Sequence, residues 1–362
     1  MWDIINGMST GLWDTGTYLN NNKKLIIRIL RFLKKYQLNY HVLPSSHDLV
    51  PGHTATMSSY SGTILSLDDF MTLSSGLVTT ETSLFVYNTS LFDAASPVGQ
   101  VFEPVRVMAA NRLAKTGKEF TDLVSLYNSG TYNNQWMVID YNRVGDDGSL
   151  EDGALWVLEQ LPGRIWAADQ TQVLRGKGYW ASYNRAFYPE AFKLSGAQDL
   201  VDKHGSWFSY SGTPRAQIMM RDQSSVVDEK SMIKLMRYNS FQTDPLAVVP
   251  GCPSPIPAAS IANRCDLTSP DSDCDWQDLD YMVGHQPYGA LDMKFVTRRL
   301  LQSQQFYAVA GPTHSPDMPP FSWSSTNLTS IPRYKPIIVF DFQPVVHTWI
   351  MGGIQDAIKR IF

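Results

Sequence analysis

The clearest pattern in the chain is a set of short apolar and β-branched runs separated by turn residues. Phe70–Leu73 and Leu77–Ser83 flank a Ser74-Ser75-Gly76 turn, which is typical of two adjacent antiparallel strands. Four further runs have the same character: Thr63–Leu67, Met137–Tyr141, Ala154–Leu161 and Arg164–Ala168. The short connections between them favour an antiparallel sheet.

Helical periodicity occupies other parts of the chain. Lys23–Tyr36 carries apolar residues at helical spacing and basic residues opposite them, which predicts an amphipathic helix. Residues 101–127 predict a pair of helices that closes near Asn128 and Gly130, and Asp228–Tyr238 predicts another helix. A last strand is expected at Ile337–Phe342, followed by a helix-like tail from Ile350 to Phe362.

The order of these elements predicts the fold class. A sheet, a helix pair and a second sheet follow one another without repeated strand–helix–strand units, which favours an α+β fold with antiparallel sheets. The chain also contains neither GxGxxG nor GxxxxGK[ST], so we expect no nucleotide cofactor and, more generally, no cofactor.

Polar side chains are concentrated in Asn128–Tyr141, where amides, hydroxyls and aromatic rings directly precede an apolar run. One interpretation is a Ser/Asn/Gly turn that enters a buried strand, and the other is part of a functional site. The pattern alone leaves both interpretations open.

The N-terminal residues 1–22 show neither helical nor strand periodicity and are expected to be poorly ordered. Ser9 there matches GxSxG, but without a preceding core strand and a following helix this motif is a weak indication of a nucleophile.

Composition excludes several classes of function. With 362 residues and 43% hydrophobic positions the chain can build a substantial core, and a net charge of -4 gives no electrostatic footprint for nucleic acid. No apolar run approaches the ~20 residues of a transmembrane helix, and the N-terminus has no signal-peptide pattern. Yet Asn88 and Asn327 both match the N-glycosylation pattern, which belongs to exported proteins.

The three cysteines, Cys252, Cys265 and Cys274, lie in one Pro- and Ser-rich stretch. One disulfide and one free thiol are expected, because no CxxC pair or fourth close ligand indicates zinc, and we predict no metal site. We predict Cys252 and Cys265 as the pair, although the spacing leaves the pairing open.

Several motifs occur in an order that resembles a known family. They are Ser75–Thr79, Ala110–Ala114, Ser129–Trp136, Leu158–Gln160, Tyr179–Asn184, Trp207–Tyr210, Arg221–Ser224, Met236–Asn239 and Gly311–Thr313. Together they resemble the phospholipase B-like family of lysosomal or secreted glycoproteins, within the N-terminal nucleophile hydrolase superfamily. The resemblance runs from about Leu30 to about Phe342 and divides the chain into a non-matching N-terminus (residues 1–22), a hydrolase domain (23–345) and a divergent tail (346–362).

The resemblance implies a four-layer αββα sandwich of two antiparallel sheets. It also implies hydrolysis of an ester or amide, with deacylation of phospholipids as one activity, a lipid or other acylated small molecule as the partner, and a lysosomal or secreted location. In that family, the resemblance implies, the chemistry needs a cysteine at the start of the mature chain, and the amino group of this cysteine accepts the proton. Upstream of Lys23 this sequence offers Asp3 and Asn20 at the expected distance instead, so the nucleophile and its strand are expected to be missing.

Other site residues carry over from the family pattern. Asn184 matches the amide that stabilises the oxyanion, Arg215 matches an arginine near the nucleophile, and Ser83 keeps a hydroxyl where the family has threonine. Within Asn128–Tyr141, the resemblance implies that Tyr132, Asn134 and Trp136 form the wall of the substrate cleft.

Three hypotheses account for a retained cleft without its nucleophile. The first is a replaced N-terminus, through truncation or a wrongly assigned start, and we favour it. The second is a non-catalytic protein that binds lipid or another ligand in the cleft. The third, ranked last, is a serine hydrolase that uses Ser9.

Overall fold

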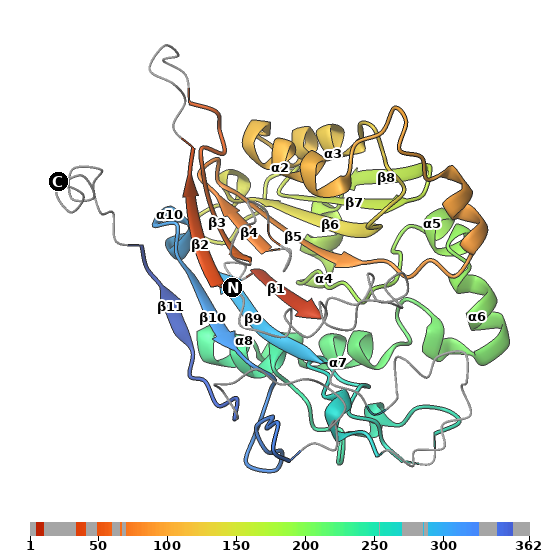
Figure 1. Cartoon of the computed structure of the whole chain (residues 1–362). Coiled ribbons are helices and arrows are strands. Elements are labelled where there is room, and N and C mark those ends of the chain that lie inside the picture. Colours follow the sequence, from red (N-terminus) through yellow and green to blue (C-terminus); the bar gives the residue numbers. More distant parts are fainter. Residues whose placement is uncertain are drawn as a thin grey trace.

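The structure is a computed structural model of the whole chain (Figure 1). It describes residues 5–10, 34–40, 49–59, 66, 70–252, 254–269, 285, 289–325 and 339–349. Two antiparallel sheets and several helices make up this part of the chain, so the predicted α+β class with antiparallel sheets is confirmed.

The larger sheet has seven strands, and each strand pairs with its neighbours in the sequence. In order across the sheet the strands are β2 (Lys34–Asn39), β3 (Thr54–Ser59), β4 (Phe70–Leu73), β5 (Leu77–Ser83), β6 (Asn134–Asp140), β7 (Leu155–Leu161) and β8 (Arg164–Asp169). The predicted strands over β4 to β8 are therefore confirmed. Gly76 closes the β4–β5 turn at φ +86°, a backbone conformation that glycine adopts without strain.

The smaller sheet joins distant parts of the chain. Its four strands, in order, are β1 (Ile5–Thr10), β9 (Ala290–Val296), β10 (Phe306–Ala310) and β11 (Val345–His347). The expectation that residues 1–22 are poorly ordered is wrong for residues 5–10, because their backbone pairs antiparallel with β9. Ser9 lies within this strand, opposite Asp292, rather than at a strand-to-helix turn.

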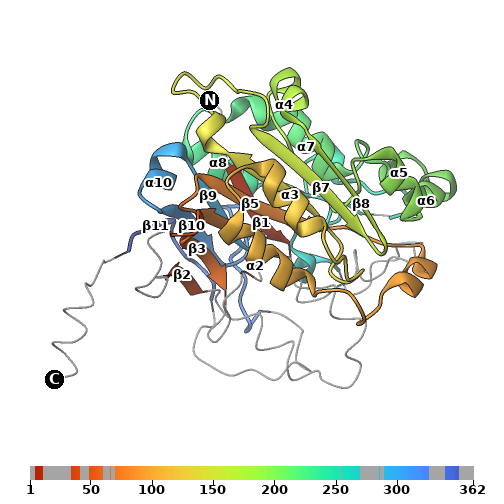
Figure 2. The same ribbon diagram turned by 90° about the horizontal axis from the view of Figure 1, so that it is seen from above.

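Helices cover both sheets from outside (Figure 2). α2 (Glu103–Leu113) and α3 (Gly117–Ser125) pack on the larger sheet, where Phe120 contacts Trp136 of β6. α7 (Pro214–Asp222) and α8 (Glu229–Met236) lie against the smaller sheet, with Ile218 packed among β9 and β10 residues. Between the sheets, Phe70 of β4 meets Phe306 of β10 edge-on.

Shorter helices complete the described part. They are α4 (Thr171–Lys177), α5 (Pro189–Leu194), α6 (Ala197–His204) and α10 (Arg298–Gln302). The sequence pattern did not predict these four helices, nor α7, β9 and β10, whereas α2, α3 and α8 lie within their predicted ranges.

Two predicted elements are wrong within the described residues. The end of the predicted helix Lys23–Tyr36 belongs to β2, where Tyr36 and Leu38 both pack toward the core with the two-residue period of a strand. Within the predicted strand Ile337–Phe342, the described residues 339–342 form only a single bridge, at Val339, and residues 337–338 lie outside the described part. Residues 23–33, Asn327 and the tail from Ile350 lie outside the described residues, as does the predicted strand Thr63–Leu67 apart from Ser66.

The predicted disulfide between Cys252 and Cys265 is wrong. Cys252 is disulfide-bonded, but Cys265 is a free thiol that is completely buried. Cys265 opens a short 3-10 turn, and the ion pair between Arg264 and Asp266 on either side of it fixes that turn with the thiol inside. Burial raises the pKa of the Cys265 thiol to about 12, so the group stays protonated and unreactive at neutral pH.

Candidate functional site

A cavity of about 230 Å³ lies between β5, β6 and β7 of the larger sheet and the helices α4, α7 and α8. Its walls are apolar over most of their area. The apolar lining residues include Met137, Ile139, Leu155, Leu174, Met219, Met232, Leu235, Met236 and Ile261. Polar groups also line it, and they come from the end of β5 and from the segments that carry Tyr183 and Arg215. Such a combination fits a ligand with one apolar and one polar part.

Asn184, Arg215 and Ser83 are brought together beside this cavity. The Asn184 Nδ2 donates to the Ser83 backbone carbonyl at 2.7 Å, and Arg215 Nη2 donates to Asn184 Oδ1 at 2.8 Å. Arg215 Nη2 also donates to the Tyr183 carbonyl at 2.9 Å, and both Arg215 and Tyr183 line the cavity. The residues predicted to be catalytic therefore form one hydrogen-bonded unit, in which Ser83 takes part through its backbone.

Local sequence explains how two of these side chains are held. Arg215 follows Pro214 in the first turn of α7, and Thr213 caps that turn by accepting a hydrogen bond from the Ala216 amide at 3.2 Å. Asn184 has φ +59°, a left-handed conformation that asparagine adopts more readily than most residues. The site thus combines a capped helix start with a strained loop position.

Glu159 of β7 anchors the loop that carries Asn184. Its carboxylate is completely buried and accepts from the amides of Phe187 at 2.5 Å and Tyr188 at 3.1 Å, and from Gln135 Nε2 at 2.6 Å. Burial raises the pKa of Glu159 to about 7, although the three hydrogen bonds act in the opposite direction. Glu159 does not line the cavity, and its role is to hold the loop that carries Asn184.

Further polar contacts shape the end of β5. Tyr132 Oη donates to Glu81 Oε1 at 3.3 Å, and the Thr82 and Ser182 hydroxyls hydrogen-bond each other. Glu81, Thr82 and Ser182 line the cavity, so Tyr132 lies one contact behind its wall. Tyr183 also lines the cavity, where burial, reinforced by the neighbouring Tyr179, raises the pKa of Tyr183 above its usual range and keeps the phenol neutral.

Asn134 and Trp136 lie elsewhere. Both side chains donate to Glu103 Oε1 of α2, from Asn134 Nδ2 at 3.3 Å and from Trp136 Nε1 at 2.8 Å. Because side chains alternate along a strand, the cavity is lined instead by Met137 and Ile139 of β6. The structure thus separates these two predicted substrate-binding residues from the cavity by the thickness of the sheet.

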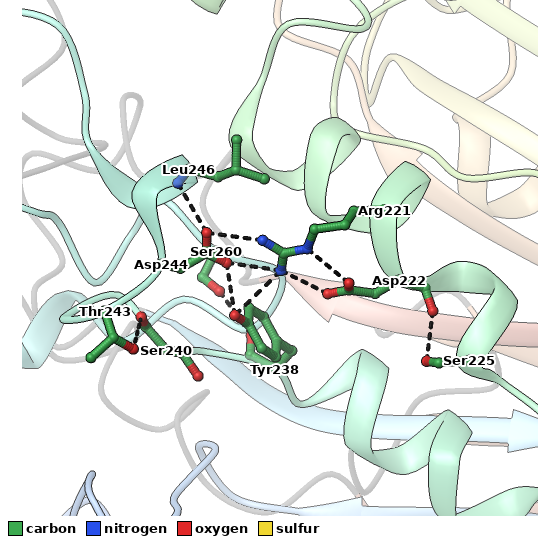
Figure 3. Close-up of polar contacts among 9 residues, drawn as sticks. All are labelled: Arg221, Asp222, Ser225, Tyr238, Ser240, Thr243, Asp244, Leu246 and Ser260. Carbon is green, nitrogen blue, oxygen red and sulfur yellow. Dashed lines mark hydrogen bonds and ion pairs between the residues drawn. The ribbon is translucent and has the colours of Figure 1, made fainter.

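A polar cluster stiffens the helical side of the cavity (Figure 3). Arg221 of α7 holds both oxygens of Asp244, at 3.0 and 2.9 Å, and Tyr238 Oη donates to the same carboxylate at 2.7 Å. Asp222 pairs with the other edge of Arg221. These contacts tie the end of α7, where Met219 lines the cavity, to the chain that follows α8.

Several other features bear on chemistry. Within the described residues no group of three or more His, Cys, Asp or Glu side chains is arranged to hold a metal ion. In the same part of the chain, no helix combines the length and apolarity that crossing a bilayer requires. The glycosylation candidate Asn88 is half-buried, and its Nδ2 donates to the Leu194 carbonyl at 3.4 Å.

Sequence reasoning did not single out Glu81, Ser182 or Glu159 as site residues, although Ser182 and Glu159 stand in motifs that support the family resemblance. The signal that could have found Glu159 is a carboxylate in the middle of an apolar strand, because such a group is buried only with hydrogen-bond partners.

Comparison with known proteins gives the family. A family model described as Phospholipase B matches residues 24–347. Phospholipase B-like 2 from Homo sapiens is 41% identical over 324 residues, which is 89% of this chain and 54% of that protein. Phospholipase B-like 1 from Rattus norvegicus is 40% identical over 287 residues, or 79% of this chain and 48% of that protein. The chain thus spans about half the length of the curated relatives it matches.

Among solved structures, a variant of the conjugated bile acid hydrolase from Clostridium perfringens aligns over 87% of this chain and 88% of its own, with 9% identity and a TM-score of 0.33. A score of that size does not establish a shared fold. The family is shown by the sequence matches, and the matched residues 24–347 span Asn184 and Arg215. The chain belongs to the phospholipase B-like family.

Proposed function

We propose that this chain forms the acyl-binding and oxyanion-stabilising part of a phospholipase B-like site that hydrolyses an ester or amide of an acylated lipid. The observation that supports it most is the Asn184–Arg215 unit beside a mostly apolar cavity. An acyl chain fits the apolar walls. The cationic guanidinium and the amide suit the carbonyl or phosphate oxygens of the same molecule.

The layer order supports the finer proposal of an αββα sandwich of the N-terminal nucleophile type. α2 and α3 pack on the larger sheet, the two sheets pack on each other, and α7 and α8 pack on the smaller sheet. The resemblance to the phospholipase B-like family implies an N-terminal cysteine as the nucleophile. Among the described residues that line the cavity there is no cysteine, and we propose that residues 1–362 alone bind an acyl lipid without hydrolysing it.

A second candidate function is a non-catalytic lipid-binding protein. This second function is favoured because hydrogen bonds already engage the Asn184 amide, which donates to the Ser83 carbonyl and accepts from Arg215.

The lysosomal or secreted location and glycosylation at Asn88 stay proposals. Glycosidase treatment of the protein from its natural source tests both, because an unshifted mass would contradict them.

Replacing Arg215 with methionine is expected to weaken binding of an ether-linked lysophospholipid, which cannot be hydrolysed. Methionine keeps much of the side-chain volume and removes the charge that holds a phosphate or carbonyl oxygen. Charge-assisted hydrogen bonds of this kind contribute about 1.5 to 3 kcal/mol, which corresponds to a loss of roughly tenfold to a hundredfold in affinity. Titration calorimetry measures the change.

The matched control is Arg164→Met at the exposed start of β8, which should leave affinity unchanged. Asn184→Gly is a second test, because glycine accepts the φ of +59° and removes only the amide. Affinity that is indifferent to both Arg215→Met and Asn184→Gly would place the ligand elsewhere. Release of fatty acid from an ester substrate by residues 1–362 alone would contradict the proposed lack of hydrolysis.

A further inference from the structure

The cavity between the larger sheet and the helices α7 and α8 has a sheet wall and a helix wall. On the sheet wall, Thr80 and Thr82 of β5 and Met137 and Ile139 of β6 line it, and each pair occupies alternate positions of its strand. These four residues therefore lie on the face of the larger sheet opposite α2 and α3. The helix wall includes Met219 of α7.

The two ends of the cavity differ in polarity. At one end the Thr82 and Ser182 hydroxyls hydrogen-bond each other, and Arg215 donates to Asn184 Oδ1 at 2.8 Å. At the other end of the sheet wall, Ile139 packs against the apolar cluster that lies between the two sheets. A ligand in this cavity therefore places its polar group at the Asn184 end and directs its apolar tail toward Ile139.

The sheet wall gives the length of the cavity. Thr82, at the polar end, pairs with Gln135 of β6. From Gln135 to Ile139 the strand advances by four residues, which is about 13 Å at about 3.3 Å per residue. An extended alkyl chain advances by about 1.25 Å per carbon, because its single bonds of about 1.5 Å form a zigzag. This wall therefore matches a chain of about ten carbons.

The helix wall gives a similar length. Arg215, Met219 and Gln223 are spaced four residues apart and all line the cavity, so one face of α7 and the residue directly after it form this wall. The eight residues from Arg215 to Gln223 span about 12 Å at about 1.5 Å per residue. The two walls thus agree in length.

The volume of the cavity leads to the same size of ligand. It is about 230 Å³. An apolar cavity of about 150 Å³ holds one benzene molecule, which has six carbons, so in proportion this cavity holds roughly nine carbons. A lipid with two long acyl chains therefore cannot place both of them inside.

Core packing closes the apolar end of the sheet wall. Ile139 and Leu150 contact the cluster between the sheets, where Val78, Val144 and Leu300 are 0%, 4% and 2% exposed. Protein interiors are packed densely and contain few voids. A chain that is longer than the cavity must therefore displace core side chains or fold back toward the polar end.

We propose that the cavity selects a single acyl chain of medium length, about eight to ten carbons, and that Ile139 sets the limit. The inference rests on the proposed function, because it specifies the acyl group of the ligand that the same site binds. Up to the limit, each added methylene leaves water for the apolar walls and raises the affinity about fourfold. Beyond the limit, added carbons find no free space, and the affinity stops rising.

A series of ether-linked lysophospholipids with chains of about 6 to about 16 carbons tests this selection, each measured by titration calorimetry below the concentration at which it forms micelles. The affinity is expected to rise about fourfold per carbon up to about ten carbons and then to level off or fall. An affinity that keeps rising to the longest chain would overturn the proposal.

Substitutions at Ile139 test the limit itself. Ile139→Phe should shorten the preferred chain by about three carbons, and Ile139→Ala should lengthen it by about three, because each side chain differs from isoleucine by that many carbons. The matched control is Val138→Ala. Val138 is the next residue of β6, is equally part of the core, and faces α2 and α3, so its loss should leave the preferred length unchanged.

A preferred length that stays the same in both Ile139 variants, or that Val138→Ala shifts as much as they do, would show that Ile139 does not set the limit. Should Ile139→Phe fail to fold, Ile139→Ala still decides the question. Circular dichroism of each variant checks that it is folded.

The chain-length series also separates this inference from the proposed function. If ether lipids of no length bind, the proposed function is contradicted and the length selection with it. If they bind with an affinity that depends on Arg215 but has no length limit, the proposed function stands and only the length selection is wrong.

Discussion

Replacing Trp136 with alanine will lower the free energy of unfolding by about 3 to 5 kcal/mol. Trp136 is 2% exposed and packs against Phe120 with ring centroids 5.8 Å apart. The substitution leaves a large cavity under α3 and removes the Nε1 hydrogen bond to the buried Glu103 carboxylate. Urea unfolding followed by far-ultraviolet circular dichroism measures the loss.

Trp136→Phe serves as the matched control. It keeps an aromatic ring beside Phe120 and loses mainly the hydrogen bond to Glu103, so a smaller loss of about 1 to 3 kcal/mol is expected. If alanine and phenylalanine destabilised the protein equally, Trp136 would act through Glu103 and not through packing. A loss below about 1 kcal/mol for alanine would show that Trp136 is not a core residue.

The stability of the protein will decline as pH rises from about 4.5 to about 7 through the titration of Glu159. Its pKa is about 7 in the folded chain, against the ordinary glutamate value of 4.5. Because the folded pKa is the higher one, the folded state keeps its proton in this window while the unfolded state loses it. The stabilisation is complete below the lower pKa and lost above the higher one, and it amounts to about 3 kcal/mol.

Glu159→Gln isolates this contribution, because glutamine cannot titrate and keeps one oxygen for the Phe187 or Tyr188 amide. Urea unfolding at several pH values between about 4 and 8 compares the two proteins. The difference in unfolding free energy between them should change through the window by about 3 kcal/mol. A difference that stays constant with pH would show that Glu159 has the same pKa in the folded and unfolded states.

The sequence predicted β4 to β8 of the larger sheet because their signals are local, but it predicted neither β2 nor β3. β4 and β5 are two β-branched runs around a Ser-Ser-Gly turn, and both features are visible within a few residues. β9 was not predicted, although Leu291, Met293 and Phe295 alternate with Asp292 and Lys294. Its polar residues Asp292 and Lys294 are buried, so this strand does not have the solvent-facing polar side that such alternation usually indicates.

The site was predictable only in part. Asn184 and Arg215 came from the family resemblance, and neither a helix at α7 nor a left-handed residue at 184 could be expected from periodicity. The stretch Asn128–Tyr141 indicated polar residues at the start of a strand, but not which face of the sheet each side chain takes. Trp136 and Met137 are consecutive in the strand and therefore point to opposite faces of the sheet. Trp136 contacts Glu103 on one face, and Met137 lines the cavity on the other.

The two sheets differ in the sequence separation of their paired strands. We expect this difference to set the order in which the sheets fold. Every pairing in the larger sheet joins strands that are consecutive in the sequence, whereas β1 pairs with β9 across most of the chain. Local contacts close smaller loops and form faster. Pulsed hydrogen exchange during refolding should therefore protect the β6 and β7 amides before those of β9, and the reverse order would contradict it. The protein then forms its seven-stranded sheet first and its four-stranded sheet late.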